Sequence, residues 1–88
     1  MDLQINQIVE LRRGDKGVVA GFNNQPFLLV FAGFTSVLTR YNEDLKHKNR
    51  DYDIIRVFDG SNVADVKEVF KSRFSTEGLP VVWESVAD

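Results

Sequence analysis

Basic and aromatic side chains alternate in the segment 40–56, which makes it the part of the chain best suited to hold a ligand. Five cations occur there with two tyrosines and the single histidine. Cations interleaved with aromatic rings bind single-stranded nucleic acid or anionic small molecules through charge and stacking. The candidate ligand- or partner-binding residues are therefore Arg40, Tyr41, Lys46, His47, Lys48, Arg50, Tyr52 and Arg56.

Carboxylates in the same segment weaken that interpretation. Glu43, Asp44, Asp51 and Asp53 nearly cancel the local positive charge. General acid–base catalysis requires carboxylates whose pKa values are pushed apart, usually by burial. Carboxylates that flank so many cations are more simply explained by charge pairing in solvent, and Asp44 by a role in shaping a turn.

No catalytic or metal-binding constellation stands out elsewhere in the sequence. His47 has nearby carboxylates but lacks the partners of a catalytic triad or a His-rich metal site. No serine lies in a nucleophile-elbow context, and cysteine is absent. The loop 14–17 has the glycines of a phosphate cradle or an RNA-binding clamp, but a strand follows it where those motifs need a helix. We therefore expect a protein that is not an enzyme and has no cofactor or metal.

Size and composition are those of one ordered domain spanning 1–88. The chain is 43% hydrophobic and 27% charged, and its net charge is −2. That charge argues against a general nucleic-acid binder, which usually carries a basic excess. The first residues lack the features of a signal peptide, and the apolar run 27–34 is too short to span a bilayer as a helix. The absence of cysteine agrees with a reducing compartment, so we expect a soluble cytoplasmic protein.

Short β-strands must position these side chains. The apolar residues at 5, 8, 9 and 11 fit either a helical turn or a first strand. Turns are expected at 12–17 and 23–26, where Gly, Asn and Pro gather. The runs that read as strands are 18–22, 27–32, 35–41, 53–58 and 79–86, of which 27–32 is apolar on both faces and is expected to be the most buried.

One helix is expected late in the chain, over 62–74. Val63, Val66, Phe70 and Phe74 recur at helical spacing, and Asn62 suits the N-cap. Four or five short strands, one helix and a last strand predict a mostly β fold with one α-helix. A strongly bent antiparallel sheet closed into an SH3-like barrel is the first choice, and an open α+β sandwich is the alternative.

Three motifs in order give the chain a family resemblance. They are the turn Tyr41-Asn42-Glu43-Asp44-Leu45-Lys46-His47, the strand Asp53-Ile54-Ile55-Arg56-Val57-Phe58 and the pair Trp83-Glu84, preceded by a Gly-containing hairpin at 14–22. In these the chain resembles small uncharacterised proteins encoded by phages and prophages of Gram-positive bacteria. It departs from them at Ser85, where that group commonly has Arg, and in the length of the predicted helix. The resemblance implies a phage-type accessory protein in the cytoplasm of a bacterial host.

Two functions remain open from the sequence. The first is binding to a host or phage protein through an exposed sheet edge or an aromatic patch, with inhibition of a host defence or regulatory protein as the role that the resemblance implies. Exposed members of the set Phe34, Tyr41, Tyr52 and Trp83 would mark such a patch. The second is binding of nucleotide or nucleic acid by the segment 40–56. Edge strands also make a homo-oligomer conceivable, because unpaired strands add to one another.

Overall fold

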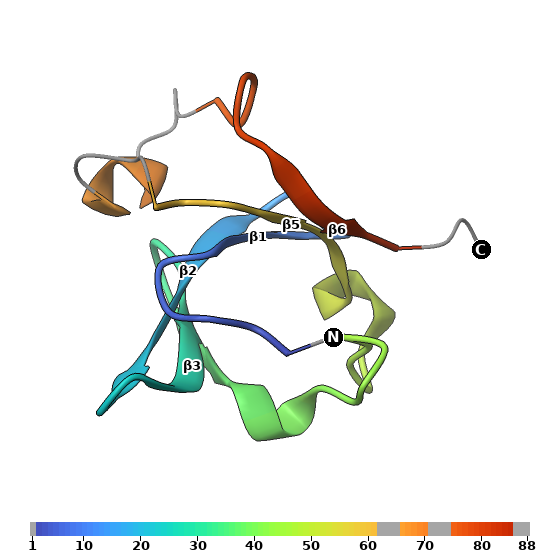
Figure 1. Ribbon diagram of the computed structural model, residues 1–88. Coiled ribbons are helices and arrows are strands. Elements are labelled where there is room, and N and C mark those ends of the chain that lie inside the picture. The colour runs from blue at the N-terminus through green and yellow to red at the C-terminus, as the bar shows by residue number, and fades with distance from the viewer. Residues whose placement is uncertain (1, 62–65, 71–74, 86–88) are drawn as a thin grey trace.

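Six strands form one antiparallel sheet in the computed structural model, which describes residues 2–61, 66–70 and 75–85. The order across the sheet is β4-β3-β2-β1-β5-β6, and every neighbouring pair is antiparallel (Figure 1). The strands are β1 (Ile8–Leu11), β2 (Lys16–Phe22), β3 (Gln25–Val30), β4 (Thr35–Val37), β5 (Ile54–Phe58) and β6 (Val81–Glu84).

The sheet is bent but open, so the predicted SH3-like barrel is wrong. β4 and β6 lie at opposite edges and do not pair with one another within the described residues. Closure would require these two edge strands to pair, and both are short, because β4 has only three residues and β6 four. The expected strand 35–41 ends at Val37, and the chain turns into the 3-10 helix η1 (Leu38–Arg40) instead of continuing toward closure.

The expected α-helix over 62–74 is also not found. The part of it that the structure describes is the five-residue 3-10 helix η3 (Val66–Phe70), and 62–65 and 71–74 lie outside the described residues. The other helical segments are the single turns η1 and η2 (Arg50–Tyr52). Thus no described helix reaches seven residues. The alternative prediction of an open α+β sandwich is therefore wrong, as is the barrel. The β-branched valines at 66 and 69 give the segment low helix propensity.

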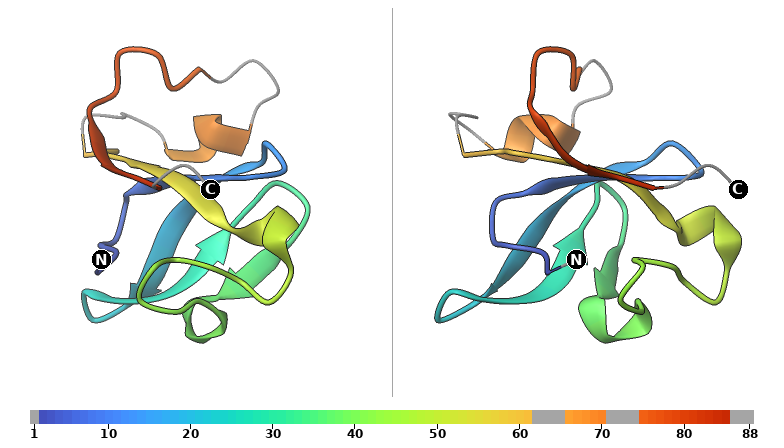
Figure 2. Two further views of the ribbon diagram at one scale, coloured as in Figure 1. Left: turned by 90° about the vertical axis from the view of Figure 1, so that its right-hand side faces the viewer. Right: turned by 45° about the vertical axis from the view of Figure 1, so that its right-hand side comes forward.

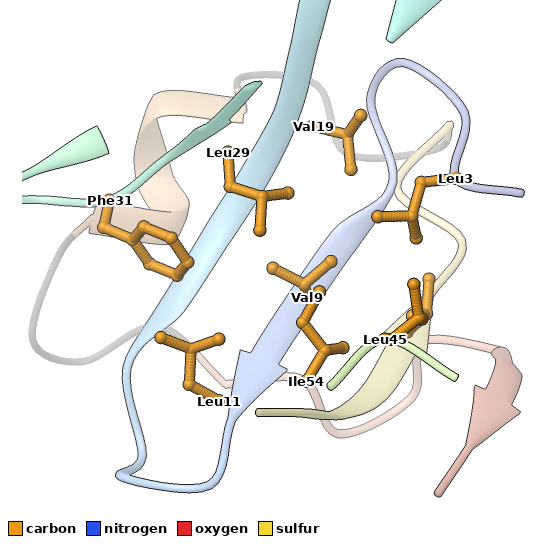
Figure 3. Packing of buried hydrophobic residues seen from close by; sticks show 9 residues of the cluster. Leu3, Val9, Leu11, Val19, Leu29, Phe31, Leu45 and Ile54 are labelled. Carbon is orange, nitrogen blue, oxygen red and sulfur yellow. The ribbon is translucent and has the colours of Figure 1, made fainter. Parts of the chain in front are cut away.

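Apolar residues are buried on both faces of the central strands. On the inner face of the bend, Val9 and Leu11 of β1 pack with Val19, Leu29 and Ile54 from neighbouring strands, as Figure 3 shows. Leu3 from the N-terminal segment and Leu45 from the long loop 38–53 between β4 and β5 also belong to this cluster, together with Phe31 and Val57. The loop and the N-terminal segment lie within the bend of the sheet (Figures 1 and 2).

A second, smaller cluster occupies the other face. Ile8, Val18 and Phe58 are buried there together with Val69 of η3. Side chains of consecutive strand residues point to opposite faces, so Ile8 and Val9 belong to different clusters. The most buried strand is therefore β1 and not the run 27–32, in which Leu29 and Phe31 are buried but Phe27 is 46% exposed.

A two-residue turn joins β2 to β3. Asn23 and Asn24 have positive φ angles of 51° and 63°, which is typical of a type I′ hairpin turn. The turn is shorter than the expected 23–26, because Gln25 and Pro26 already belong to β3 and oppose Phe22 and Gly21. Of the opening residues, 8–11 form strand β1. The predicted strand 53–58 is confirmed from Ile54 onward as β5, because Asp53 ends the 3-10 turn η2.

Candidate functional site

Two adjoining surface hollows lie where the end of η1 meets the segment 46–48. The first, of about 360 Å³, is lined by Thr39, Arg40, His47 and Lys48. The second, of about 370 Å³, shares these residues and adds Tyr41, Asn42 and Lys46. We call the two together the basic hollow. Five of the eight predicted binding residues therefore meet at one place in the fold.

The loop that forms this hollow is held by the side chain of Asn42. Its Oδ1 accepts hydrogen bonds from the backbone N–H groups of Asp44 (2.8 Å) and Lys46 (3.1 Å). This is the Asx-turn geometry that favours Asn at the start of a turn. Leu45 follows with a φ of 60° and is only 4% exposed, so burial in the main core holds a backbone conformation that leucine rarely adopts.

Aromatic contacts fix the orientation of His47. Its ring lies 5.2 Å from that of Tyr41 and 5.4 Å from that of Tyr52, centroid to centroid. The hydroxyl of Tyr41 donates a 2.9 Å hydrogen bond to the carbonyl oxygen of Tyr52. Nδ1 of His47 accepts the backbone N–H of Asn49 at 3.0 Å, so the neutral imidazole carries its proton on Nε2. Burial raises the pKa of Tyr41, an effect that outweighs the opposing hydrogen bond with Ser36.

The carboxylates of the segment 40–56 are not among the residues that line the basic hollow. Asp53 is 4% exposed, accepts the backbone N–H of His47, and has Oδ2 3.5 Å from Nη2 of Arg12. Glu43 lines a neighbouring hollow, which shares Tyr41 and Asn42 with the basic hollow. The sequence alone could not reveal which of these side chains line the basic hollow, because residues adjacent in the chain diverge at a turn.

Three predicted residues lie outside the hollow. Arg50 and Tyr52 belong to η2, where Tyr52 packs against the core and contacts His47. Arg56 lies on β5 and joins two strands, since it bonds Glu10 of β1 at 2.9 Å and Glu84 of β6 at 3.1 Å. These two hydrogen bonds raise the pKa of Arg56. The structure thus places Arg56 in an ion-pair network across the sheet.

Comparison of the chain with protein-family models, curated proteins and solved structures found no match. The function must therefore be argued from the geometry. The described residues contain no group of three His, Cys, Asp or Glu side chains that could hold a metal ion. None of their helical segments has the length and apolar character needed to cross a membrane.

Arg13 is a contributor that the sequence did not single out. Its guanidinium lies 5.1 Å from the ring centroid of Tyr52 and 5.8 Å from that of Phe34. Its Nη1 donates a 2.9 Å hydrogen bond to the Tyr52 hydroxyl. A cation above two rings stabilises their arrangement, and one of these rings, Tyr52, contacts His47. No local pattern could have shown this, because Arg13 and Tyr52 are 39 residues apart.

The aromatic side chains that are most exposed among the described residues are not those that the sequence suggested. Each of Phe34, Tyr41, Tyr52 and Trp83 is only partly exposed and packs against the main core. Phe22 and Phe27 are instead 69% and 46% exposed, with ring centroids 6.0 Å apart at the end of the β2–β3 hairpin. The signal available in the sequence was their position on either side of the Asn-Asn turn, which sets them in neighbouring strands.

Proposed function

We propose that this chain is a small, non-enzymatic binding domain that attaches to a partner protein through the tip of its β2–β3 hairpin. The observation that carries the proposal is the pair Phe22 and Phe27, which present adjacent rings to solvent. Large exposed aromatic side chains are costly to leave in water and are enriched among the residues that dominate protein interfaces. The occupant we propose is an apolar pocket on another protein.

The hairpin presents these rings in a fixed geometry, which favours binding. Next to the turn, Phe22 pairs with Gln25 and Gly21 with Pro26. The register shifts between Gly21 and Ala20, where Phe27 is the extra residue of β3, and regular pairing then runs from Ala20 to Val18. Asn23 and Asn24 adopt the positive φ angles of a type I′ turn. A rigid element loses little conformational entropy when it enters a pocket. The tip therefore supports recognition of a folded partner.

The polar groups of the long loop support a binding role over catalysis. The buried carboxylate of Asp53 accepts a backbone hydrogen bond and faces Arg12. The Nδ1 atom of His47 is occupied by the N–H of Asn49. A general base needs a free acceptor within reach of the substrate, and these two groups are used to build the loop.

The resemblance to phage and prophage proteins directs the proposal to a bacterial partner. Under it, the chain acts in the cytoplasm of the host and inhibits a defence or regulatory protein by occupying its surface. This step is an analogy with the family and adds no residue role of its own.

Site-specific photocrosslinking tests the proposal. A photoreactive phenylalanine analogue at position 22 is expected to give a discrete crosslink to one host protein, and the same analogue at the exposed position Glu77 is not. The partner is then purified and its affinity is measured. Phe22→Ser with Phe27→Ser is expected to weaken binding by about 30-fold or more, as for interface hot spots.

The matched control is Val81→Ser with Val82→Ser. These valines are 50% and 45% exposed on the edge strand β6, away from the hairpin. The control is expected to leave the affinity within about threefold of the wild-type value. Equal crosslinking from both probe positions, or an affinity unchanged by the phenylalanine substitutions, would refute the proposal.

A further inference from the structure

The basic hollow is a second candidate site, independent of the hairpin tip. We propose that it binds a phosphate group carried by a nucleotide, either free or within a single strand of nucleic acid. The proposal rests on the charges, the donor groups and the size of the hollow, in that order.

Two of the three cations in the hollow have no ion-pair partner among the described residues. Arg40, Lys46 and Lys48 line the hollow, and no carboxylate does. Within the part of the chain that the structure describes, neither Arg40 nor Lys48 makes an ion pair. By contrast, Arg56 lies between two glutamates. Cations left unpaired around a concavity attract an anion, because a recess focuses their field.

The polar groups around the hollow are largely donors, which matches phosphate. Arg40 offers a planar guanidinium and Lys48 an ammonium group, and neither can accept a hydrogen bond. His47 adds a further donor, because Nδ1 accepts the N–H of Asn49 and leaves the proton on Nε2. Thr39 contributes a hydroxyl. Phosphate oxygens accept such hydrogen bonds, and charge on both partners strengthens them.

Size and aromatic content extend the match from phosphate to nucleotide. The two parts of the hollow measure about 360 and 370 Å³, near the lower end of the range of small-ligand sites, about 300 to 1,000 Å³. Tyr41 and His47 both line it, with ring centroids 5.2 Å apart. Rings beside cations suit a base that carries a phosphate.

Hydrogen bonds within the protein hold the backbone around the hollow in place without a ligand. The Asn42 side chain closes the turn through two backbone hydrogen bonds. The Asp53 carboxylate holds the backbone of His47 at 2.8 Å. These two residues act as positioning residues, since neither carboxylate nor amide is needed to contact the anion. A preordered backbone lowers the ordering cost of binding.

The test is an amide NMR titration of the full chain with sodium pyrophosphate, adenosine 5′-monophosphate and a short oligothymidylate, with acetate as the anion control. The proposal expects pyrophosphate and the nucleotide to shift the signals of residues 39–48, and acetate to leave them unchanged. Arg40→Gln with Lys48→Gln is expected to weaken binding by about tenfold or more, because two charge-assisted contacts are lost.

The matched control is Lys16→Gln with Arg50→Gln, which removes the same charge from outside the hollow. It is expected to change the affinity by less than about threefold. Amide spectra of both variants establish that each is folded. Absence of shifts at 39–48 with every phosphate probe, equal shifts with acetate, or equal weakening in the two double variants would overturn the proposal.

The probes also distinguish the two sources of the phosphate. Tighter binding of oligothymidylate than of the nucleotide, with a dependence of log affinity on log salt of about −0.7 per phosphate contacted, supports a single strand. Equal or tighter binding of the nucleotide supports a free nucleotide. The variant Phe22→Ser with Phe27→Ser is expected to retain phosphate binding, so the failure of either proposal leaves the other to be decided by its own test.

Discussion

The backbone N–H of His47 donates a 2.8 Å hydrogen bond to Oδ1 of Asp53, a residue that is only 4% exposed. Asp53 directly precedes β5, and its Oδ2 lies 3.5 Å from Nη2 of Arg12, just beyond β1. A single carboxylate therefore ties the wall of the basic hollow to the ends of the neighbouring strands β1 and β5. The position of His47 depends on the sheet through this contact.

Replacing Asp53 by Ala should destabilise the protein by about 2 kcal/mol, because the N–H of His47 loses an acceptor that is charged and buried. Urea unfolding followed by the fluorescence of the single tryptophan, Trp83, measures the change. Asp51→Ala is the control, since Asp51 is exposed and should change stability by no more than about 0.5 kcal/mol. Equal effects of the two substitutions would contradict the role assigned to Asp53.

Gly21→Ala should also destabilise the protein. A Cβ at this position would collide with the carbonyl oxygen of Gln25, which is backbone and cannot swing aside. Forced overlap in a packed region costs about 1–3 kcal/mol. Gly33→Ala places its methyl group in open space and should leave stability unchanged or raise it by up to about 1 kcal/mol. Thermal unfolding compares the two, and a Gly21 variant as stable as the Gly33 variant would disprove the close approach.

The stability of the protein should fall at alkaline pH in a way that depends on Tyr41. Burial raises the pKa of Tyr41 in the folded state above its ordinary value of 10.0. The unfolded chain therefore loses this proton first, and the stabilisation present below pH 10 is lost as pH rises through the folded-state pKa. The slope from one such group is at most about 1.4 kcal/mol per pH unit.

Tyr41→Phe should flatten this alkaline limb, because phenylalanine has no proton to lose. The same substitution should cost about 1 kcal/mol at neutral pH, since the hydrogen bond to the carbonyl of Tyr52 disappears. Urea unfolding at a series of pH values from 8 to about 11 gives both quantities. Parallel alkaline slopes for the wild-type protein and the variant would show that another group is responsible.

The stability of the hairpin should depend strongly on which residue occupies position 24 in the turn. Asn24 has a φ of 63°, which costs a β-branched residue about 1–2 kcal/mol. Asn24→Val should therefore destabilise the hairpin by that amount, whereas Asn24→Gly should be tolerated, because glycine adopts positive φ freely. Hydrogen exchange of the amides in β2 and β3 reports on the change. Equal protection in both variants would argue against the type I′ turn.

The sequence predicted most of the strands but not whether the two edge strands pair with one another. Strands with alternating or β-branched patterns, such as those that became β2 and β5, were found within a few residues of their ends. The barrel was predicted from strand count and length, and closure is a property of pairing between distant edges. The helix over 62–74 was predicted from periodicity and from the N-cap residue Asn62, although valine at 66 and 69 disfavours it.

The candidate site was predicted in composition but not in arrangement. Arg40, Lys46 and Lys48 do meet around one hollow, because the turn at Asn42 brings 46–48 back toward η1. Arg56 lies elsewhere, because a strand carries it across the sheet to Glu10 and Glu84. The position of Phe22 and Phe27 on either side of the Asn-Asn turn predicts that they are neighbours, but not that they are exposed. Without the fold, an apolar residue is normally assigned to the core.

The brevity of the two outer strands has a consequence for how copies of this protein behave at high concentration. A neighbouring molecule that added to β4 or β6 would find only three or four residues with which to form backbone hydrogen bonds. Pro80, directly before β6, offers no N–H to extend that register. Fibrous stacking through these short edges is thereby disfavoured.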